Sequence, residues 1–238
     1  MRLTFKLITL LSFFLSASIT HAQQSLVFTV GEGAVIQEIS MRVLTEAYQK
    51  LDINIQVKKM PNARALKSAN NGTFDGDVSR VKSIEAKFAN LIRVPIEINY
   101  LQAQAFSADK SLAIDGWDSL KDKILISVLG IKFVENNLKK RNIACNFLPS
   151  FTQAMKMLDR GRADAAIFPR IVGITASRDA GTPNVLPIGE PLMKLSLFHY
   201  INKKHQATAD KLAVVLKQMK TSGRISEIRD QYVKEKSF

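Results

Sequence analysis

The sequence has few of the residues on which catalytic and metal sites depend. Its 238 residues include one cysteine, Cys145, and three histidines, so an intramolecular disulfide is excluded. No His/Cys cluster has metal-ligand spacing, no acidic loop has calcium spacing, and Gly31-Glu32-Gly33 alone is a weak phosphate-binding signal. We therefore expect no metal and no organic cofactor, and we expect Cys145 to be a packing residue, because free cysteine is commonly buried.

Acidic residues are in the minority. The chain has 34 Lys and Arg against 21 Asp and Glu, a formal net charge of +13. Such an excess favours anionic partners or an anionic membrane surface. The basic residues are nevertheless spread along the chain, and the densest runs are Lys58-Lys59, Lys139-Lys140-Arg141 and Lys203-Lys204. No aromatic residues interleave with these runs, so we do not predict nucleic-acid binding.

Only one hydrophobic run is long and free of charge, and it lies at the N-terminus. Arg2 and Lys6 precede an apolar stretch over residues 7–19, which ends near the small residue Ala22. A charged start, a short apolar middle and a small residue before the cut are the parts of a secretory signal peptide, and the run is shorter than the roughly 20 residues that span a bilayer. We predict cleavage after Ala22 and export to the periplasm. No cysteine lies near the cut, so we expect no lipid anchor.

The rest of the chain alternates strand and helix patterns. In the first half, strands are predicted at 26–30, 53–57 and 74–78, with helices between them that begin near residues 36 and 61. In the second half, strands are predicted at 124–129, 144–148 and 163–168, with helices after the first two. This alternation is typical of parallel sheets covered by helices.

Two further strands connect these units. A long strand over 99–107 leaves the first unit, a proline-rich segment at 183–191 leaves the second, and a strand over 195–201 leads back, followed by two C-terminal helices. Two α/β units joined by two crossings predict two lobes with a cleft between them. Ligands of open α/β sheets bind at the carboxyl ends of the strands, and closure of two lobes is a hinge motion.

Several short segments, in this order and spacing, carry a resemblance to a known family. They are Pro61-Asn62-Ala63-Arg64-Ala65-Leu66, Asn71-Gly72-Thr73-Phe74-Asp75-Gly76, Arg80, Asn90-Leu91-Ile92-Arg93-Val94-Pro95, Trp117-Asp118-Ser119-Leu120-Lys121, Gly130 and Gly161-Arg162-Ala163-Asp164-Ala165-Ala166. Together they resemble the bacterial extracellular solute-binding proteins of family 3, the amino-acid-type periplasmic binding proteins of ABC importers. The resemblance implies an α/β fold of the periplasmic-binding-protein type II, with two lobes joined by two hinge crossings. After a signal peptide at 1–22, it places lobe 1 at 23–107 plus 193–238 and lobe 2 at 108–192.

The same resemblance implies a function. The chain is expected to be a monomer that captures a small polar or anionic solute, an amino acid or an organic acid, for an ABC transporter permease or a membrane sensor. It is not expected to be an enzyme. Two alternatives stay open: a dehydratase-like enzyme on the same fold, with Glu32, Asp77 and Lys132 as acid–base candidates, and a signalling module that has lost amino-acid binding.

The family's ligand-binding positions map onto a few residues. Arg80 matches the arginine that grips the ligand carboxylate, which suits a guanidinium fork, and Arg64 is a second candidate near a helix start. The segment Gly130-Ile131-Lys132 matches a helix start whose free N–H groups hold an anion. Ile131 stands where the family often has a hydroxyl residue, and Lys132 is a candidate to replace that lost donor.

One position departs from the family more strongly. Amino-acid binders usually carry an acidic residue five positions after the residue that matches Asp164, and this chain has Pro169 there, followed by Arg170. An arginine does not pair with a ligand's ammonium group. The departure favours a dicarboxylate, another organic anion or a non-zwitterionic ligand held by Arg80 and Arg170, although Glu32 is a candidate to supply a negative charge.

Overall fold

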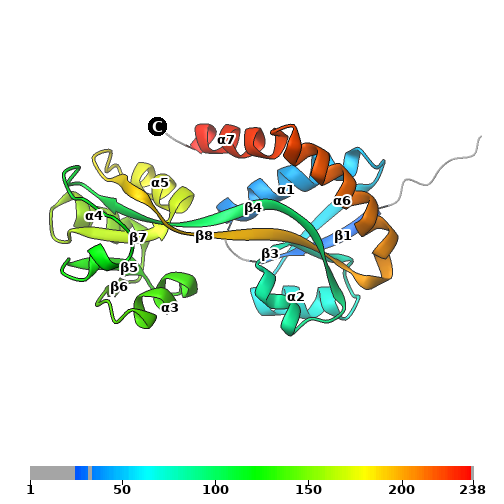
Figure 1. The fold of residues 1–238 in the computed structure, drawn as a ribbon, viewed down its shortest axis with the longest axis horizontal. Coiled ribbons are helices and arrows are strands. Elements are labelled where there is room, and N and C mark those ends of the chain that lie inside the picture. Colours follow the sequence, from blue (N-terminus) through cyan, green and yellow to red (C-terminus); the bar gives the residue numbers. More distant parts are fainter. Residues whose placement is uncertain (1–24, 32–33, 237–238) are drawn as a thin grey trace, which may run out of the picture.

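The computed structural model describes residues 25–31 and 34–236 (Figure 1). The predicted signal peptide and its cleavage site after Ala22 lie outside these residues. The helices and strands are β1 (Ser25–Val30), α1 (Ala34–Gln49), β2 (Asn54–Lys59), α2 (Asn62–Asn70), β3 (Gly76–Arg80), β4 (Leu91–Ser107), β5 (Leu125–Val128), α3 (Lys132–Lys140), β6 (Asn146–Leu148), α4 (Phe151–Asp159), β7 (Ala165–Pro169), α5 (Arg170–Asp179), β8 (Leu186–Asn202), α6 (Gln206–Thr221) and α7 (Arg224–Lys236). None of the described helices is both long and apolar enough to cross a membrane.

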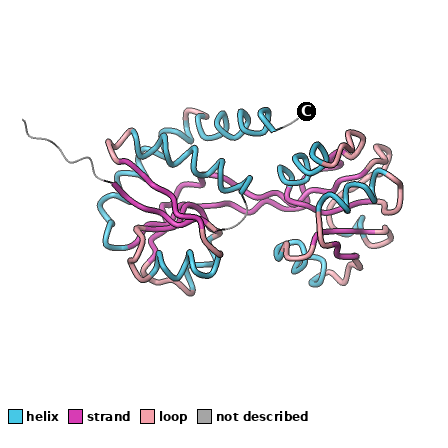
Figure 2. Tube along the Cα trace, turned by 180° about the vertical axis from the view of Figure 1, so that it is seen from behind, coloured by secondary structure: helices cyan, strands magenta, loops and turns pink. Residues whose placement is uncertain are grey.

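Two long strands connect two lobes. The strand order is β2-β1-β3-β8-β4-β7-β5-β6. The 17-residue strands β4 and β8 pair antiparallel from Leu91 opposite Asn202 to Ser107 opposite Leu186. They run side by side from one lobe into the other (Figures 1 and 2). They are the two crossings that the sequence pattern predicts. The exact lobe boundaries, at residues 107–108 and 192–193, stay a prediction.

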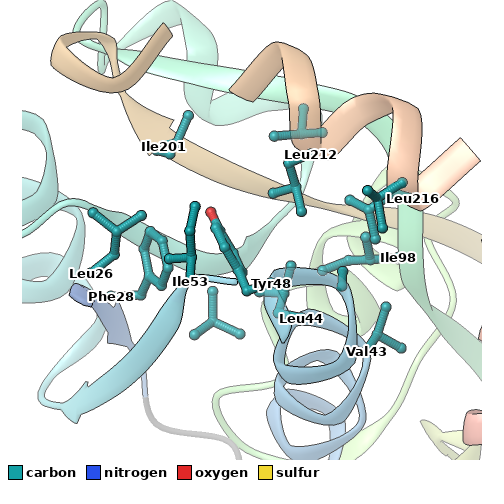
Figure 3. Packing of buried hydrophobic residues seen from close by; sticks show 14 of the residues in the cluster. Leu26, Phe28, Val43, Leu44, Tyr48, Ile53, Ile98, Ile201, Leu212 and Leu216 are labelled. Carbon is teal, nitrogen blue, oxygen red and sulfur yellow. The ribbon is translucent and has the colours of Figure 1, made fainter. Parts of the chain in front are cut away.

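The core of lobe 1 lies mainly between the sheet and helices α1 and α6. Leu26 and Phe28 of β1 pack with Leu44 and Tyr48 of α1 and with Leu212 of α6, all at most 2% exposed (Figure 3). Helix α2 packs on β1 and β3. The apolar residues of α1 and α6 recur at helical spacing, so each helix presents one stripe to the sheet.

The core of lobe 2 has two parts, one on each side of its strands. On one side Val134 and Leu138 of α3 pack with Leu125 and Ile167. On the other side helices α4 and α5 pack against a second cluster that includes the fully buried Phe106. Each lobe is therefore a sheet with helices on both faces, as its strand–helix alternation predicts.

Helix α5 is missing from the prediction made from the sequence. Its first residues, Arg170 to Thr175, include four β-branched residues and Gly173, all of which have low helix propensity. Tertiary packing overrides that propensity here. Strand β8 begins earlier than predicted and includes Pro187 and Pro191. Strand β4 pairs along one edge of β8, whereas β3 pairs with the opposite edge only at residues 198–201. The edge of residues 186–197 that faces away from β4 is therefore unpaired, and both prolines are tolerated there.

Close approach of α5 to β4 requires a glycine at position 173. A Cβ atom at Gly173 would overlap the ring of the fully buried Phe106 and lie 2.9 Å from its Cε1 atom. We expect Gly173→Ala to lower the free energy of unfolding by about 2 kcal/mol in urea titrations, because overpacking outweighs the better helix propensity of alanine. Adding Phe106→Leu should restore part of the loss. An unchanged or higher urea midpoint for Gly173→Ala would contradict this packing.

Helix α7 lies along both lobes near the crossing strands (Figure 1). At its start Arg224 pairs with Glu46 of α1, at 2.9 Å. Further along, Tyr232 packs in one apolar cluster with Ile39 of α1 and Ile171 of α5. At its end, Arg178 of α5 donates a hydrogen bond to the carbonyl of Lys236, at 2.7 Å. Helix α7 thereby links lobe 1 to the first helix turn and the last helix turn of α5.

Candidate functional site

A cavity of about 500 Å³ lies between the two lobes. This volume falls within the roughly 300–1,000 Å³ typical of small-molecule sites. Strands β3 and β7 end at it, and helices α1, α2, α4 and α5 begin at it, as the lining residues show. The cavity is therefore at the carboxyl ends of strands from both units, where the fold predicts a ligand.

The cavity has a polar wall and an apolar wall. Lobe 1 contributes Gln37, Asn62, Ser79 and Arg80, together with Val35, Ile36 and Val81. The crossing strands contribute Leu101 and Leu197, and lobe 2 contributes Phe151, Pro169 and Val172. Every lining residue from the crossing strands and from lobe 2 is apolar. Arg80 is the one charged side chain among the described residues that line the cavity.

Arg80 is held by a buried carboxylate. Its Nε and Nη2 atoms donate to the two oxygens of Asp77, at 2.9 and 3.0 Å. The Asp77 side chain is 0% exposed and that of Arg80 is 12% exposed. The hydroxyl of Thr29 also donates to Asp77, at 2.9 Å. Burial raises the pKa of the Asp77 carboxyl above its ordinary value, and the Arg80 guanidinium is the strongest influence that opposes this rise. Asp77 therefore fixes the guanidinium at the cavity wall.

Part of the Arg80 guanidinium stays available to a ligand. Its Nη1 atom donates to the side-chain oxygen of Asn62, at 2.6 Å. A guanidinium has five N–H donors. The bonds to Asp77 and Asn62 use three of them, and one donor each on Nη1 and Nη2 remains. An arginine can bind a carboxylate bidentately through one donor on each of these two nitrogens.

Gly31 gives the Arg80 side chain its room. A Cβ atom at Gly31 would overlap the Asn62 oxygen and lie 2.8 Å from Arg80 Nη2. Helix α2 begins at Asn62, after Pro61, with no side-chain cap on its first turn. The uncapped N–H groups and the helix dipole add positive potential beside the guanidinium. The polar wall is thus suited to one anionic group.

Other candidates predicted from the sequence lie outside the cavity lining. Arg64 is an exposed residue of α2. At the start of α3, the N–H of Gly130 donates to Glu135, at 2.6 Å, and Lys132 pairs with the other oxygen of Glu135, also at 2.6 Å. Ile131 packs beside the lobe 2 core. The chain's own Glu135 thus accepts from the Gly130 N–H and the Lys132 ammonium, two of the donors that the resemblance assigns to a ligand.

The positions around Pro169 differ from the prediction in a specific way. Pro169 lines the cavity, so an apolar ring stands where the family usually has a carboxylate. Arg170 is not part of the lining; its Nη1 donates to the side-chain oxygen of the buried Gln104, at 2.9 Å. Glu32 lies outside the described residues. The pair Arg80 and Arg170, predicted to hold a ligand together, does not face one cavity.

Sequence reasoning missed several lining residues, and helix starts are the signal that would have found them. Asn62, Phe151 and Val172 each lie in the first turn of a helix that follows a strand. The rule that ligands bind at the carboxyl ends of strands points to these positions. Ser79 was missed beside Arg80; it donates to Gln37, at 2.9 Å, so the two side chains support each other at the wall.

The two described acid–base candidates, Asp77 and Lys132, are engaged by other side chains of the chain. Both oxygens of Asp77 accept hydrogen bonds from Arg80, and Lys132 pairs with Glu135 on an exposed helix start. Burial raises the pKa of the Cys145 thiol to about 12, so the thiol is protonated at neutral pH. Within residues 25–31 and 34–236, no group of three or more His, Cys, Asp or Glu side chains is placed to hold a metal ion.

Comparison with known proteins identifies the fold. No family model matches the sequence. An uncharacterised protein from Shewanella oneidensis is 25% identical over 196 residues, which cover 79% of this chain and 74% of that protein. The crystal structure of a probable amino-acid ABC transporter extracellular-binding protein from Bacillus subtilis superposes with a TM-score of 0.70 at 16% identity, over 88% of this chain and 98% of that one. The fold is the type II periplasmic-binding-protein fold.

Solved structures with this fold serve more than one role. A histidine kinase sensor domain with similarity to periplasmic binding proteins superposes with a TM-score of 0.62 at 12% identity, over 88% of this chain and 96% of that one. At these identities the likeness establishes the fold, and the ligand must be argued from the cavity of this chain.

Proposed function

We propose that this chain is a periplasmic solute-binding protein that captures a small organic solute between its lobes for a membrane transporter or a membrane sensor. The observation that carries the proposal is the cavity of about 500 Å³ into which the polar wall presents Arg80. Asp77 and Asn62 fix the guanidinium, and its two remaining donors bind a carboxylate of the solute.

The arrangement of the lobes supports capture by closure. Lining residues come from lobe 1, from lobe 2 and from the crossing strands. A ligand that contacts both lobes is bound more strongly when they approach each other, and β4 and β8 are the segments about which they move. The predicted signal peptide supports a periplasmic location.

Ligand binding should raise thermal stability. A solute at 100 times its dissociation constant stabilises the native state by about 2.7 kcal/mol, which raises the melting temperature of a chain of this size by about 5 °C or more. A thermal-shift panel of organic acids and amino acids measures this. We expect at least one carboxylate to stabilise the wild-type protein. Absence of any hit, together with no co-purified small molecule in native mass spectrometry, would contradict the proposal.

Arg80→Lys tests whether ligand binding depends on the guanidinium donors or only on the positive charge. Lysine keeps a positive charge beside Asp77 but loses the parallel donors. We expect the affinity for the stabilising carboxylate to fall at least tenfold, while the protein remains folded by circular dichroism. Arg64→Lys, at an exposed position outside the cavity lining, is the matched control and should leave the affinity unchanged. Equal affinities in all three proteins would remove Arg80 from the site.

A further inference from the structure

The cavity discriminates between classes of carboxylate by what surrounds Arg80. All of its lining residues from lobe 2, and both from the crossing strands, are apolar: Leu101, Phe151, Pro169, Val172 and Leu197. A solute whose carboxylate is bound by Arg80 must place the rest of its body against this wall. An apolar body gains by leaving water there, whereas a polar body loses hydrogen bonds that the wall does not replace.

An ammonium group on the solute has no negatively charged counterpart in the described lining. Among the described residues Arg80 is the one charged lining residue, and its partner Asp77 is 0% exposed with both oxygens bonded to the guanidinium. Pro169 presents a ring to the cavity. Transfer of an ammonium from water to such a wall without a paired charge is costly.

A second carboxylate on the solute also lacks a positively charged partner among the described lining residues. Arg170 donates to Gln104 and lies outside the lining. Lys132 pairs with Glu135, and Gly130 donates to the same side chain. Within the described part of the chain, only one positively charged side chain therefore lines the cavity.

We propose that the solute is an amphipathic monocarboxylate, with its carboxylate on Arg80 and an apolar body, free of an ammonium group, against Phe151, Val172 and Leu197. This inference rests on the proposed solute-binding function and names its ligand class. It differs from the amino-acid ligand that the sequence resemblance implies and from a dicarboxylate held by two arginines.

Matched compounds test each part of the inference. The first set has a phenyl body and consists of 3-phenylpropanoate, phenylalanine and 3-phenylpropanamide, which differ in the ammonium and the carboxylate. The second set has an aliphatic body and consists of 4-methylpentanoate, leucine and 4-methylpentanamide. Isothermal titration of the chain beginning at Gln23 compares the six compounds, with pentanedioate as the dicarboxylate. We expect one of the two monocarboxylates to bind at least tenfold more tightly than its amino acid, its amide and pentanedioate.

The outcomes distinguish this inference from the proposed function. Tighter binding of phenylalanine, leucine or pentanedioate overturns the inference and leaves a solute-binding protein. If an amino acid binds and Glu32→Gln removes that binding, Glu32 holds the ammonium and the inference is likewise overturned. Failure of all seven compounds overturns the inference, and the proposed function fails with it only when the broad panel and native mass spectrometry also find no ligand.

Two substitutions test the apolar wall. Phe151→Ala should weaken binding of the monocarboxylate at least fivefold, whereas Phe147→Ala, at a 40% exposed position outside the lining, should not. Pro169→Asp places a carboxylate at the wall. It should lower the ratio of the affinity for the monocarboxylate to the affinity for its amino acid at least tenfold. Circular dichroism confirms that each variant folds. Equal effects of Phe151→Ala and Phe147→Ala would overturn the placement of the apolar body.

Discussion

Replacing Arg80 with alanine is expected to lower the free energy of unfolding by about 3 kcal/mol, in addition to abolishing ligand binding. The reason is Asp77, which is 0% exposed and bonded by both oxygens to the guanidinium. Removal of one partner of a buried ion pair leaves an uncompensated charge, which typically costs about 3–5 kcal/mol. Urea titration followed by circular dichroism measures the loss.

The pH dependence of this loss identifies its cause. Without Arg80, the pKa of Asp77 rises further, because the guanidinium is the strongest influence that lowers it. A native pKa above the unfolded value means that stability is lost as the pH rises. The deficit of Arg80→Ala should therefore be larger at pH 8 than at pH 5.

Two further variants complete the test of the ion pair. The double variant Asp77→Asn with Arg80→Gln removes both charges and should recover most of the stability without recovering ligand binding. Arg64→Ala, at an exposed site, should change stability by no more than about 0.5 kcal/mol. A loss in Arg80→Ala no larger than that of Arg64→Ala would show that the Asp77–Arg80 pair does not hold the site.

The second large effect is a loss of stability in mild acid that depends on His199. This side chain is fully buried in lobe 1. Its Nδ1 atom faces the carbonyls of Asp77 and Val78, at 3.0 and 3.1 Å, and its Nε2 atom faces the hydroxyl of Tyr48, at 2.9 Å. Since two carbonyls only accept, Nδ1 carries the proton and Nε2 accepts from Tyr48. The imidazole is therefore satisfied in its neutral form.

Burial lowers the pKa of His199 to about 4, from an ordinary value of 6.5. The native pKa lies below the unfolded one, so the unfolded chain takes up the proton first as the pH falls. The contribution of His199 to stability is complete above pH 6.5 and decreases between pH 6.5 and 4. Between pH 7 and pH 4.5 the free energy of unfolding should fall by about 2 kcal/mol from this group alone.

His199→Gln isolates this contribution. Glutamine has no proton to gain in this range, so its stability should decrease less steeply between pH 7 and pH 4.5 than that of the wild type. The control is His205→Gln, which removes the histidine that contacts Asp75 at 2.7 Å. Its free energy of unfolding should still show the decrease between pH 7 and pH 4.5 that is due to His199. If both variants followed the wild-type slope, His199 would not be the titrating group.

The strand–helix alternation predicts most of the fold, because both lobes are built from amphipathic elements with clear periodicity. The stripe of Leu212, Val215, Leu216 and Met219 is buried in α6. The crossing strands include the predicted stretches 99–107 and 195–201, although both begin earlier, at Leu91 and Leu186. Helix α5 was not predictable from local propensity. It packs with Gly173 against Phe106, a residue that is far away in sequence.

Of the lining residues of the candidate site, only Arg80 and Pro169 were singled out from the sequence. Arg80, the residue that the family resemblance indicates, lines the cavity. The roles of Arg170 and Gly130 depended on which neighbours compete for their hydrogen bonds, and the sequence does not show that Gln104 and Glu135 do so. The apolar wall combines residues from α4, α5 and β8, which only the folded chain brings together.

The central claim is that the cavity beside Arg80 binds a carboxylate-bearing solute. Isothermal titration of 3-phenylpropanoate and 4-methylpentanoate into the wild-type protein and into Arg80→Lys under identical conditions tests it most directly. We expect one of these acids to bind the wild type and Arg80→Lys to bind it at least tenfold more weakly. Equal affinity of the two proteins for that acid would contradict the claim.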